Sequence, residues 1–548
     1  MSEAFDVSQH EETEFDAQLL QRVGMLIVGA SLLLGIIANI LFYQNPFGIN
    51  IVIFAVALLL IALGLLDSTD RRIVWKHLAF GGPTILFSAF LAVYANFDLV
   101  IANLFLALAT AFVAIRFATI PEFLGGSWVY AISAFIQATV AGWVEAPMVV
   151  LPLAKKFVRN WQPDDVQRWQ SVVRGLMITA PVVLVFGLLL GSADLIFARG
   201  FGNVLDWLVP DNVSSIVGQM IITGLFSWFG LIAYRSMLFG PSRSAIDSTQ
   251  QPAIIDVEAE PYRPLGMIEC GMLLSSMVAL FTIFCLIQFQ YLFGGEDNIS
   301  SQGYTFSQYA RRGFFEIITV SILTMTLILA LRFITRRNTP QEEKTFVTLS
   351  GAMIGLTGVL LIAAFRRLDL YIDEYGFTRL RVETQVFIIW LGILFTVLLT
   401  DLVRQQNVLR VAIVVCGLGY ILSLNVMNLD AFIANRNIAR FERDGKIDVN
   451  YLLNDLSLDA IPQVVALLDS NDLDEYDSNY LRRSLGSKLW QLRHDADERQ
   501  WSGYHASYDR ALTALEDHAD ELDAYIDSPD DRYYSNPNAP SATPSYSR

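Results

Sequence analysis

The stretch that decides the fold is Tyr304 to Glu316, Tyr-Thr-Phe-Ser-Gln-Tyr-Ala-Arg-Arg-Gly-Phe-Phe-Glu, which leads into an apolar run ending near Leu331. Thr305 followed by Gln308 fits a capping box, which predicts that a helix begins there. At about 1.5 Å per residue, Glu316 then lies roughly 15 Å along the axis, near the middle of a hydrocarbon core about 30 Å thick. The stretch therefore predicts a membrane-spanning helix that carries charged side chains into the bilayer.

Arg312 and Glu316 are four residues apart and share one face of this predicted helix. A charge at that depth costs on the order of 3 kcal/mol unless it is paired or hydrated. One interpretation is a ligand or proton site that also includes Tyr309. The other is a structural ion pair that fixes helix register, with Gly313 allowing close helix approach. Either way, Arg312 and Glu316 are expected to compensate each other.

A second polar stretch, Phe365 to Arg381, connects two apolar runs and holds four arginines, three acidic residues and two tyrosines. Its functional interpretation is a polar lid or anion-binding rim. The alternative is an interfacial hairpin whose charges pair with one another in water. Together the two stretches supply the candidate ligand-binding residues: Tyr309, Arg312, Glu316, Arg366, Arg367, Asp369, Asp373, Glu374, Arg379 and Arg381.

Composition sets the fold class. The 548 residues are 54% hydrophobic with mean hydropathy +0.44, and many uncharged apolar runs approach 20 residues. These values predict an all-α polytopic membrane protein with about eleven or twelve spans. The expected spans lie near 23–43, 48–66, 78–95, 97–118, 173–197, 213–239, 266–292, 309–331, 345–365, 383–403 and 408–429, and the broken apolar region 122–153 suits a re-entrant segment or hairpin.

Charge and composition divide the chain further. Residues 1–20 hold six acidic and no basic side chains, and 431–548 hold 22 acidic and 12 basic ones, which leaves 21–430 neutral within a net charge of -16. The predicted organisation is an acidic disordered leader, a first membrane half, a polar linker, a second membrane half, a small soluble helical domain and a disordered tail. Their ranges are 1–20, 21–239, 240–264, 265–430, 431–527 and 528–548.

Basic residues orient the predicted spans. Clusters of Lys and Arg in 71–76, 155–174 and 332–344 mark these loops as cytoplasmic, whereas 294–308 has acidic residues and no Lys or Arg. This pattern predicts a cytoplasmic N-terminus and an external C-terminal domain, provided that 122–153 crosses the membrane an even number of times.

Several function classes lose support. The acidic balance gives no basic patch for nucleic acid. The three cysteines all lie in apolar runs and none of the five histidines does, so no metal site or cofactor is expected. The sequence also lacks a G-x-x-x-x-G-K-[ST] loop, an H-E-x-x-H motif and a G-x-S-x-G motif. ATP-driven transport by this chain alone, a zincin-type protease and a standard serine hydrolase therefore lose support.

Three groups of motifs resemble a bacterial multi-pass membrane family of unknown function, the domain group numbered forty-one seventy-three. They are Tyr309 to Glu316, then Arg367 to Tyr371 with Tyr375 to Arg381, and finally Asn428 to Ala434 with Asp448 to Leu452 and Leu456 to Pro462. The resemblance implies an integral protein of the bacterial cytoplasmic membrane. It supplies no reaction, ligand or catalytic residue.

Two functional hypotheses remain. The first is a non-enzymatic carrier, sensor or assembly component that sits in the lipid bilayer and binds a small anionic, polar or lipid ligand at the outer side. The second is an envelope enzyme acting on a lipid-linked substrate, with Asp373 or Glu374 as the candidate general base. The first is favoured because the sequence shows no pair of carboxylates at a recognisable catalytic spacing.

Overall fold

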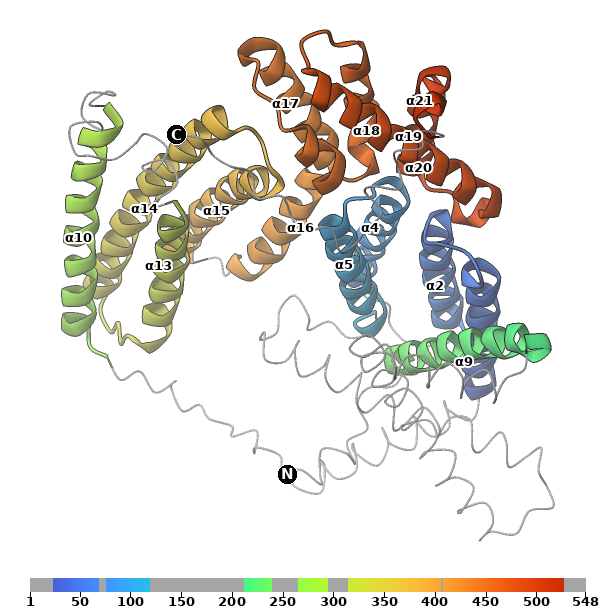
Figure 1. Cartoon of the computed structure of the whole chain (residues 1–548). Coiled ribbons are helices and arrows are strands. Elements are labelled where there is room, and N and C mark those ends of the chain that lie inside the picture. Colours follow the sequence, from blue (N-terminus) through green and yellow to red (C-terminus); the bar gives the residue numbers. More distant parts are fainter. Residues whose placement is uncertain are drawn as a thin grey trace, which may run out of the picture. The chain divides into compact units, whose positions relative to one another are not determined.

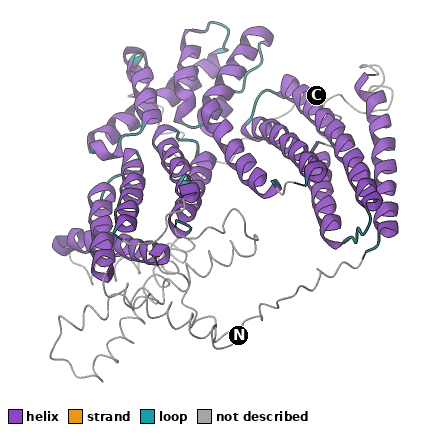
Figure 2. Cartoon of the chain, turned by 180° about the vertical axis from the view of Figure 1, so that it is seen from behind, coloured by secondary structure: helices purple, strands orange, loops and turns teal. Residues whose placement is uncertain are grey.

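The computed structural model describes residues 23–68, 75–118, 211–238, 265–293, 314–405 and 408–526. These residues form helices joined by short loops, with one isolated parallel bridge between Leu265 and Thr335 (Figure 2). Within them, nine helices have the length and apolar composition of membrane spans. The protein is thus an all-α, multi-pass membrane protein, as the sequence predicts.

These nine helices match predicted apolar runs, and the short apolar helix α4 (Gly81–Val93), preceded by α3 (Trp75–Leu78), matches the run near 78–95. The predictions for 122–153, 173–197, the leader, the linker and the tail lie outside the described residues. The nine are Val23–Phe42, α2 (Ile49–Asp67), α5 (Phe97–Arg116), α9 (Asp211–Leu238), α10 (Met267–Phe293), α13 (Phe314–Ile334), α14 (Pro340–Tyr375), α15 (Arg379–Arg404) and α16 (Leu409–Met427).

The helices fall into two compact units. The first contains Val23–Phe42, α2, most of α4 and α5, and α9. Its buried core includes Leu34, Leu58 and Tyr234, and the Tyr234 hydroxyl donates a 3.2 Å hydrogen bond to the Leu58 carbonyl. The segment Gln500–Tyr504, with its single 3-10 turn η5 (Trp501–Gly503), also belongs to this unit.

In the second unit, α14 packs against α10, α13 and α15, and α15 packs against α16 (Figure 1). Phe346 of α14, Ile328 of α13 and Leu398 of α15 are fully buried in the shared core. Lipid tails are as apolar as these side chains, so the hydrophobic effect does not drive helices together inside the bilayer. Close van der Waals packing stabilises their association instead.

Helix α14 is longer than the sequence predicts. Thr339 and Glu342 form a capping box at its start, with Pro340 in the first turn, and the helix continues for 36 residues. That is about 54 Å at 1.5 Å per residue, well beyond a 30 Å hydrocarbon core. No Gly or Pro interrupts Phe365 to Tyr375, so the polar stretch continues the helix and only Gly376–Thr378 form the connection to α15.

Gly376 ends α14 with φ +79° and ψ 175°, a conformation that side chains other than glycine's rarely adopt. A Cβ there would also lie 2.8 Å from the Asn437 Oδ1 atom. We expect Gly376→Ala to lower the free energy of unfolding by about 1–3 kcal/mol. The matched control, Gly355→Ala, has no atom within 4 Å of the new methyl group and is expected to gain up to about 1 kcal/mol. Thermal unfolding in detergent measures both, and equal stability of the two variants would contradict the expectation.

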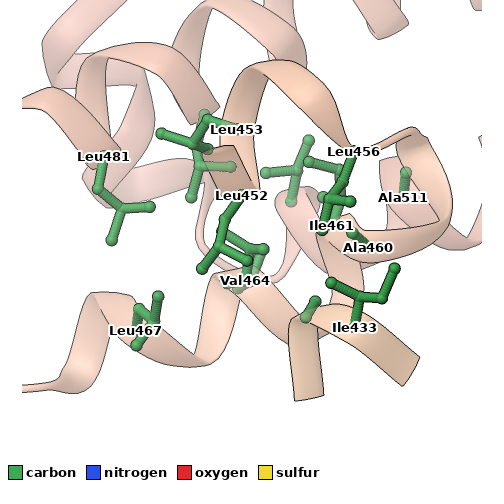
Figure 3. Close-up of a cluster of buried hydrophobic side chains, with 14 of the residues drawn as sticks. Ile433, Leu452, Leu453, Leu456, Ala460, Ile461, Val464, Leu467, Leu481 and Ala511 are labelled. Carbon is green, nitrogen blue, oxygen red and sulfur yellow. The ribbon is translucent and has the colours of Figure 1, made fainter. Parts of the chain in front are cut away.

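The C-terminal residues of the second unit form a helical layer with its own apolar core. It comprises α17 (Leu429–Asp444), η2 (Tyr451–Asp455), η3 (Leu458–Ala460), α18 (Ile461–Val464), η4 (Val465–Asp469), α19 (Glu475–Glu498), α20 (Ala506–Glu516) and α21 (Ala519–Ile526). Leu452, Leu453 and Leu456 are buried with Ile461 and Val464 (Figure 3).

Candidate functional site

The polar end of α14 is held by α17. The Asn437 side chain accepts a hydrogen bond from the Phe377 amide and donates one to the Phe377 carbonyl, both at 2.8 Å. The Arg440 guanidinium donates to the carbonyl oxygens of Asp373 at 3.2 Å and Glu374 at 2.5 Å. Carbonyls in the last turn of a helix lack intrahelical partners, so Arg440 supplies the donors that α14 needs.

Asp430, in the first turn of α17, is the most completely bonded carboxylate in this region. It is 1% exposed and accepts four hydrogen bonds: from Arg379 Nε at 2.7 Å, Arg379 Nη2 at 2.5 Å, Asn96 Nδ2 at 2.8 Å and the Ser457 amide at 2.8 Å. The two bonds from Arg379 form the bidentate geometry that makes Arg–carboxylate pairs strong and directional. Asp430 thereby ties together α15, the start of α5 and the turn before η3.

Tyr451 completes this cluster from the η2 turn. Its hydroxyl accepts a 3.0 Å hydrogen bond from the Arg379 amide, the first amide of α15. Burial raises the pKa of the Tyr451 hydroxyl, and the hydrogen bond and charge of Arg379 oppose that rise. We call Asn96, Arg379, Asp430, Tyr451 and Ser457 the Asp430 cluster.

A second buried carboxylate, Asp459, holds the short connection between α4 and α5. It is 4% exposed and accepts hydrogen bonds from the Ala95 amide at 2.7 Å, Ser457 Oγ at 3.1 Å and Arg510 Nη2 at 3.2 Å. Arg510 also donates to the Val93 carbonyl at 3.0 Å. Burial raises the pKa of Asp459, and the hydrogen bonds and the Arg510 charge partly offset that rise.

These arrangements bind protein groups rather than a metal. The oxygens of Asp430 and Asp459 already face donors from the backbone, asparagine, serine and arginine. Within the described ranges, no group of three or more His, Cys, Asp or Glu residues is placed to hold a metal ion. The chemistry that the geometry supports is the orientation of helices by buried, hydrogen-bonded charges.

The structure brings two of the predicted arginines into internal contacts. Arg379 binds Asp430, as described above. Arg381 donates to the carbonyls of Tyr375 at 3.1 Å and Gly376 at 2.5 Å, and its guanidinium lies 4.3 Å from the centre of the Tyr371 ring. Arg381 therefore fixes the α14–α15 turn, and Arg379 holds the start of α15 to α17. A third, Arg367, is 7% exposed on α14.

The other predicted residues of α14 lie on its exposed side. Arg366 and Asp369 are 3.8 Å apart and form a surface pair, while Glu374 lies 3.6 Å from Lys446. Asp373 is also exposed. Of the earlier stretch, Tyr309 and Arg312 lie outside the described residues, and Glu316 is in the first turn of α13 with its side chain outside them as well.

Asp401 and Asp430 stand at the ends of predicted spans, where lipid headgroups and water can solvate a charge. The structure instead buries both, since each is 1% exposed. Asp401 accepts from Arg332 Nη1 at 2.5 Å and from the Val408 amide at 2.7 Å. The position of Asp401 at a span end gives no indication that α13 and α16 supply these two partners.

Asn96, Asn437 and Arg440 were also missed. Asn96 carried a readable signal, because it directly precedes α5 and its Oδ1 atom accepts from the Leu99 amide at 3.0 Å, the bond typical of an N-cap. Asn437 and Arg440 are three residues apart and share one face of α17. This spacing indicates a polar contact face, but it does not indicate that α14 is the helix contacted.

His505 makes the C-terminal layer sensitive to acid. Burial, followed by the nearby charges of Arg499 and Arg510, lowers the pKa of His505 to about 4 from 6.5, and a hydrogen bond with the Tyr94 backbone opposes this shift. The folded state thus favours neutral His505. Its contribution is fully present above pH 6.5 and is lost as pH falls toward 4.

We therefore expect stability to drop between pH 6.5 and pH 4 by about 2–3 kcal/mol, since one pKa unit corresponds to about 1.4 kcal/mol. His505→Gln should flatten this part of the profile, and His494→Gln, at a side chain exposed on α19, should leave it intact. Protonation of Asp459, whose pKa is raised by burial, opposes this loss. Chemical unfolding across this pH range measures both variants, and identical slopes in wild type and His505→Gln would refute the assignment.

A family model described as "Domain of unknown function (DUF4153)" matches residues 81–467, from α4 into η4. This range contains the whole Asp430 cluster together with Asp459, Asn437 and Arg440. No curated protein and no solved structure matches the chain. Because the match covers more than half of the 548 residues, this multi-pass membrane protein belongs to the DUF4153 family of domains of unknown function.

Proposed function

We propose that this protein is a non-enzymatic sensor or assembly component of the bacterial cytoplasmic membrane that binds a polar ligand or partner at the outer side. The binding surface is the outer rim, formed by the exposed charges at the ends of α14 and α17: Arg366, Asp369, Asp373, Glu374 and Lys446. The observation that carries the proposal is the Asp430 cluster, which joins α17 to the ends of α15 and α5 through buried, directional bonds.

The outer rim is connected to the Asp430 cluster through α17. Glu374 and Lys446 form an exposed pair, and Arg440, on the same helix as Asp430, holds the carbonyls of Asp373 and Glu374. A ligand that rearranges the rim charges therefore acts on the last turn of α14 and on α17 together. Such a differential contact is what a sensor needs in order to shift a conformational equilibrium.

The enzymatic alternative gains no support from the described residues. Asp373 and Glu374, the candidate general bases, lie on an exposed helix end, and Glu374 is paired with Lys446. The buried carboxylates Asp430 and Asp459 accept hydrogen bonds from protein donors on both oxygens. A general base has to reach a proton on a substrate held beside it. Asp430 and Asp459 are buried against protein donors, and Asp373 and Glu374 stand on an exposed helix end.

Native mass spectrometry of the full chain in lipid tests the proposal. We expect a bound polar molecule or partner protein in the wild type, and its loss in Arg366→Gln and Glu374→Gln. Arg404→Gln is the matched control, because Arg404 is exposed in the last turn of α15, at the opposite end of that helix from the α14–α15 turn. A bound species that persists in the rim variants, or conversion of a lipid-linked substrate by the purified protein, would overturn the proposal.

A further inference from the structure

The loop between the first two described spans is fixed in depth by the helices on either side. Val23–Phe42 and α2 are both membrane-length apolar helices, so residues 43–48 lie at a boundary between hydrocarbon and water. Phe47 in this loop packs edge-on against Phe42, the last residue of its span, with ring centroids 6.2 Å apart. Phe47 nevertheless remains 61% exposed.

The segment Gln500–Tyr504 is attached to this loop. The Ile49 amide donates a 3.0 Å hydrogen bond to the Tyr504 carbonyl, and Asn45 Nδ2 donates a 3.4 Å bond to Gln500 Oε1. A Cβ at Gly48 would collide with the Tyr504 carbonyl oxygen, so the close approach of the two backbones requires glycine. The segment is therefore held at the depth of the loop.

Trp501, at the start of η5, is 72% exposed on this attached segment. Trp has an apolar ring and one N–H donor, which suits the headgroup region better than either bulk water or the hydrocarbon core. The surface around the loop continues the lipid-facing side of the spans, since Ile40 at the end of Val23–Phe42 is 65% exposed. Because this surface continues the lipid-facing side of the spans, the bilayer is the partner expected to contact it.

We propose that Phe47 and Trp501 form an aromatic anchor that inserts into the lipid headgroup region. The sequence predicts that residues 431–527 form a soluble domain. With this anchor, these residues also contact the membrane surface through Gln500–Tyr504, in addition to their covalent attachment after α16. The anchor is independent of the outer rim and of the ligand proposed for it.

A fluorescent label on Trp501→Cys tests the anchor in the full chain, reconstituted in phosphatidylcholine–phosphatidylglycerol nanodiscs. The matched control is Trp490→Cys, because Trp490 is 57% exposed on α19 and stacks on His494. A water-soluble maleimide discriminates against the native cysteines, which lie in apolar helices with Cys270 and Cys416 buried. Unsubstituted protein supplies the labelling background.

We expect nitroxide lipids labelled near the headgroup to quench the Trp501→Cys label several-fold more than the Trp490→Cys label, with aqueous iodide showing the reverse order. Phe47→Cys should behave like Trp501→Cys and preserves the test if the Trp501 variant fails to fold. Equal quenching at positions 501 and 490 would overturn the proposal. So would protection of position 501 from both quenchers, which indicates a protein partner or a second copy of the chain.

Discussion

Asp430→Asn is expected to lower the free energy of unfolding by about 3–5 kcal/mol, because it leaves the Arg379 guanidinium without its buried counter-ion. The amide also has one acceptor oxygen where the carboxylate presents two, and each carboxylate oxygen accepts two bonds. Two bonds are therefore lost, one from Arg379 and one from either Asn96 or Ser457. Arg379→Gln should be similarly costly, since Asp430 is then buried with only neutral donors. Chemical unfolding of the purified protein in mild detergent measures these losses.

The double variant Arg379→Gln/Asp430→Asn should lose less than the sum of the two single losses, which identifies the residues as energetic partners. Arg366→Gln/Asp369→Asn is the matched control. Those partners are 67% and 44% exposed, and such pairs contribute no more than about 1 kcal/mol. Additive losses at Arg379 and Asp430, or losses no larger than at the exposed pair, would contradict the role given to Asp430.

Asp401→Ala is expected to cost a similar amount, about 3–5 kcal/mol, through a different set of contacts. Asp401 is 1% exposed and joins three helices, since it accepts from Arg332 of α13 and from the Val408 amide at the start of α16. Removing the carboxylate leaves the Arg332 guanidinium and the Val408 amide without their acceptor. Unfolding monitored by tryptophan fluorescence should show the loss.

Arg332→Gln provides the partner variant for Asp401. It leaves the buried Asp401 carboxylate with the Val408 amide as a neutral donor, so we expect a loss similar to that of Asp401→Ala. Glu269→Ala, in the first turn of α10, is the control for removing an acidic residue at a span end. A loss at Asp401 no greater than at Glu269 would show that the Asp401 carboxylate is solvated rather than paired.

The sequence was sufficient to predict the spans because each is an apolar run of membrane length. Runs near 48–66, 383–403 and 408–429 became α2, α15 and α16 with ends shifted by a few residues. Hydrophobicity fixes which residues enter the bilayer, and helical hydrogen bonding is required once they are there. The predicted span ends near 365, where the charged residues begin, whereas α14 continues to Tyr375 and ends at Gly376, the first glycine or proline after those charges.

The buried charges resisted prediction because their partners are remote in sequence. Arg379 lies 51 residues and Asn96 lies 334 residues from Asp430, and Arg332 lies 69 residues from Asp401. Periodicity reveals neighbours on one helix but gives no information on which helices meet. The motifs around Arg379 and Asp430 were singled out by resemblance, yet their pairing required the arrangement of α5, α15 and α17.

Hydrogen–deuterium exchange of the Asp430→Asn variant in lipid nanodiscs tests most directly whether Asp430 joins α17 to the membrane helices. Amides freed from a local contact exchange faster without global unfolding. We predict faster exchange in Asp430→Asn than in wild type over residues 376–383 and 451–460, with residues 343–360 of α14 unchanged and with Asp369→Asn behaving like wild type. Exchange indistinguishable from wild type at 376–383 and 451–460, or an increase spread evenly along α14, would contradict the account.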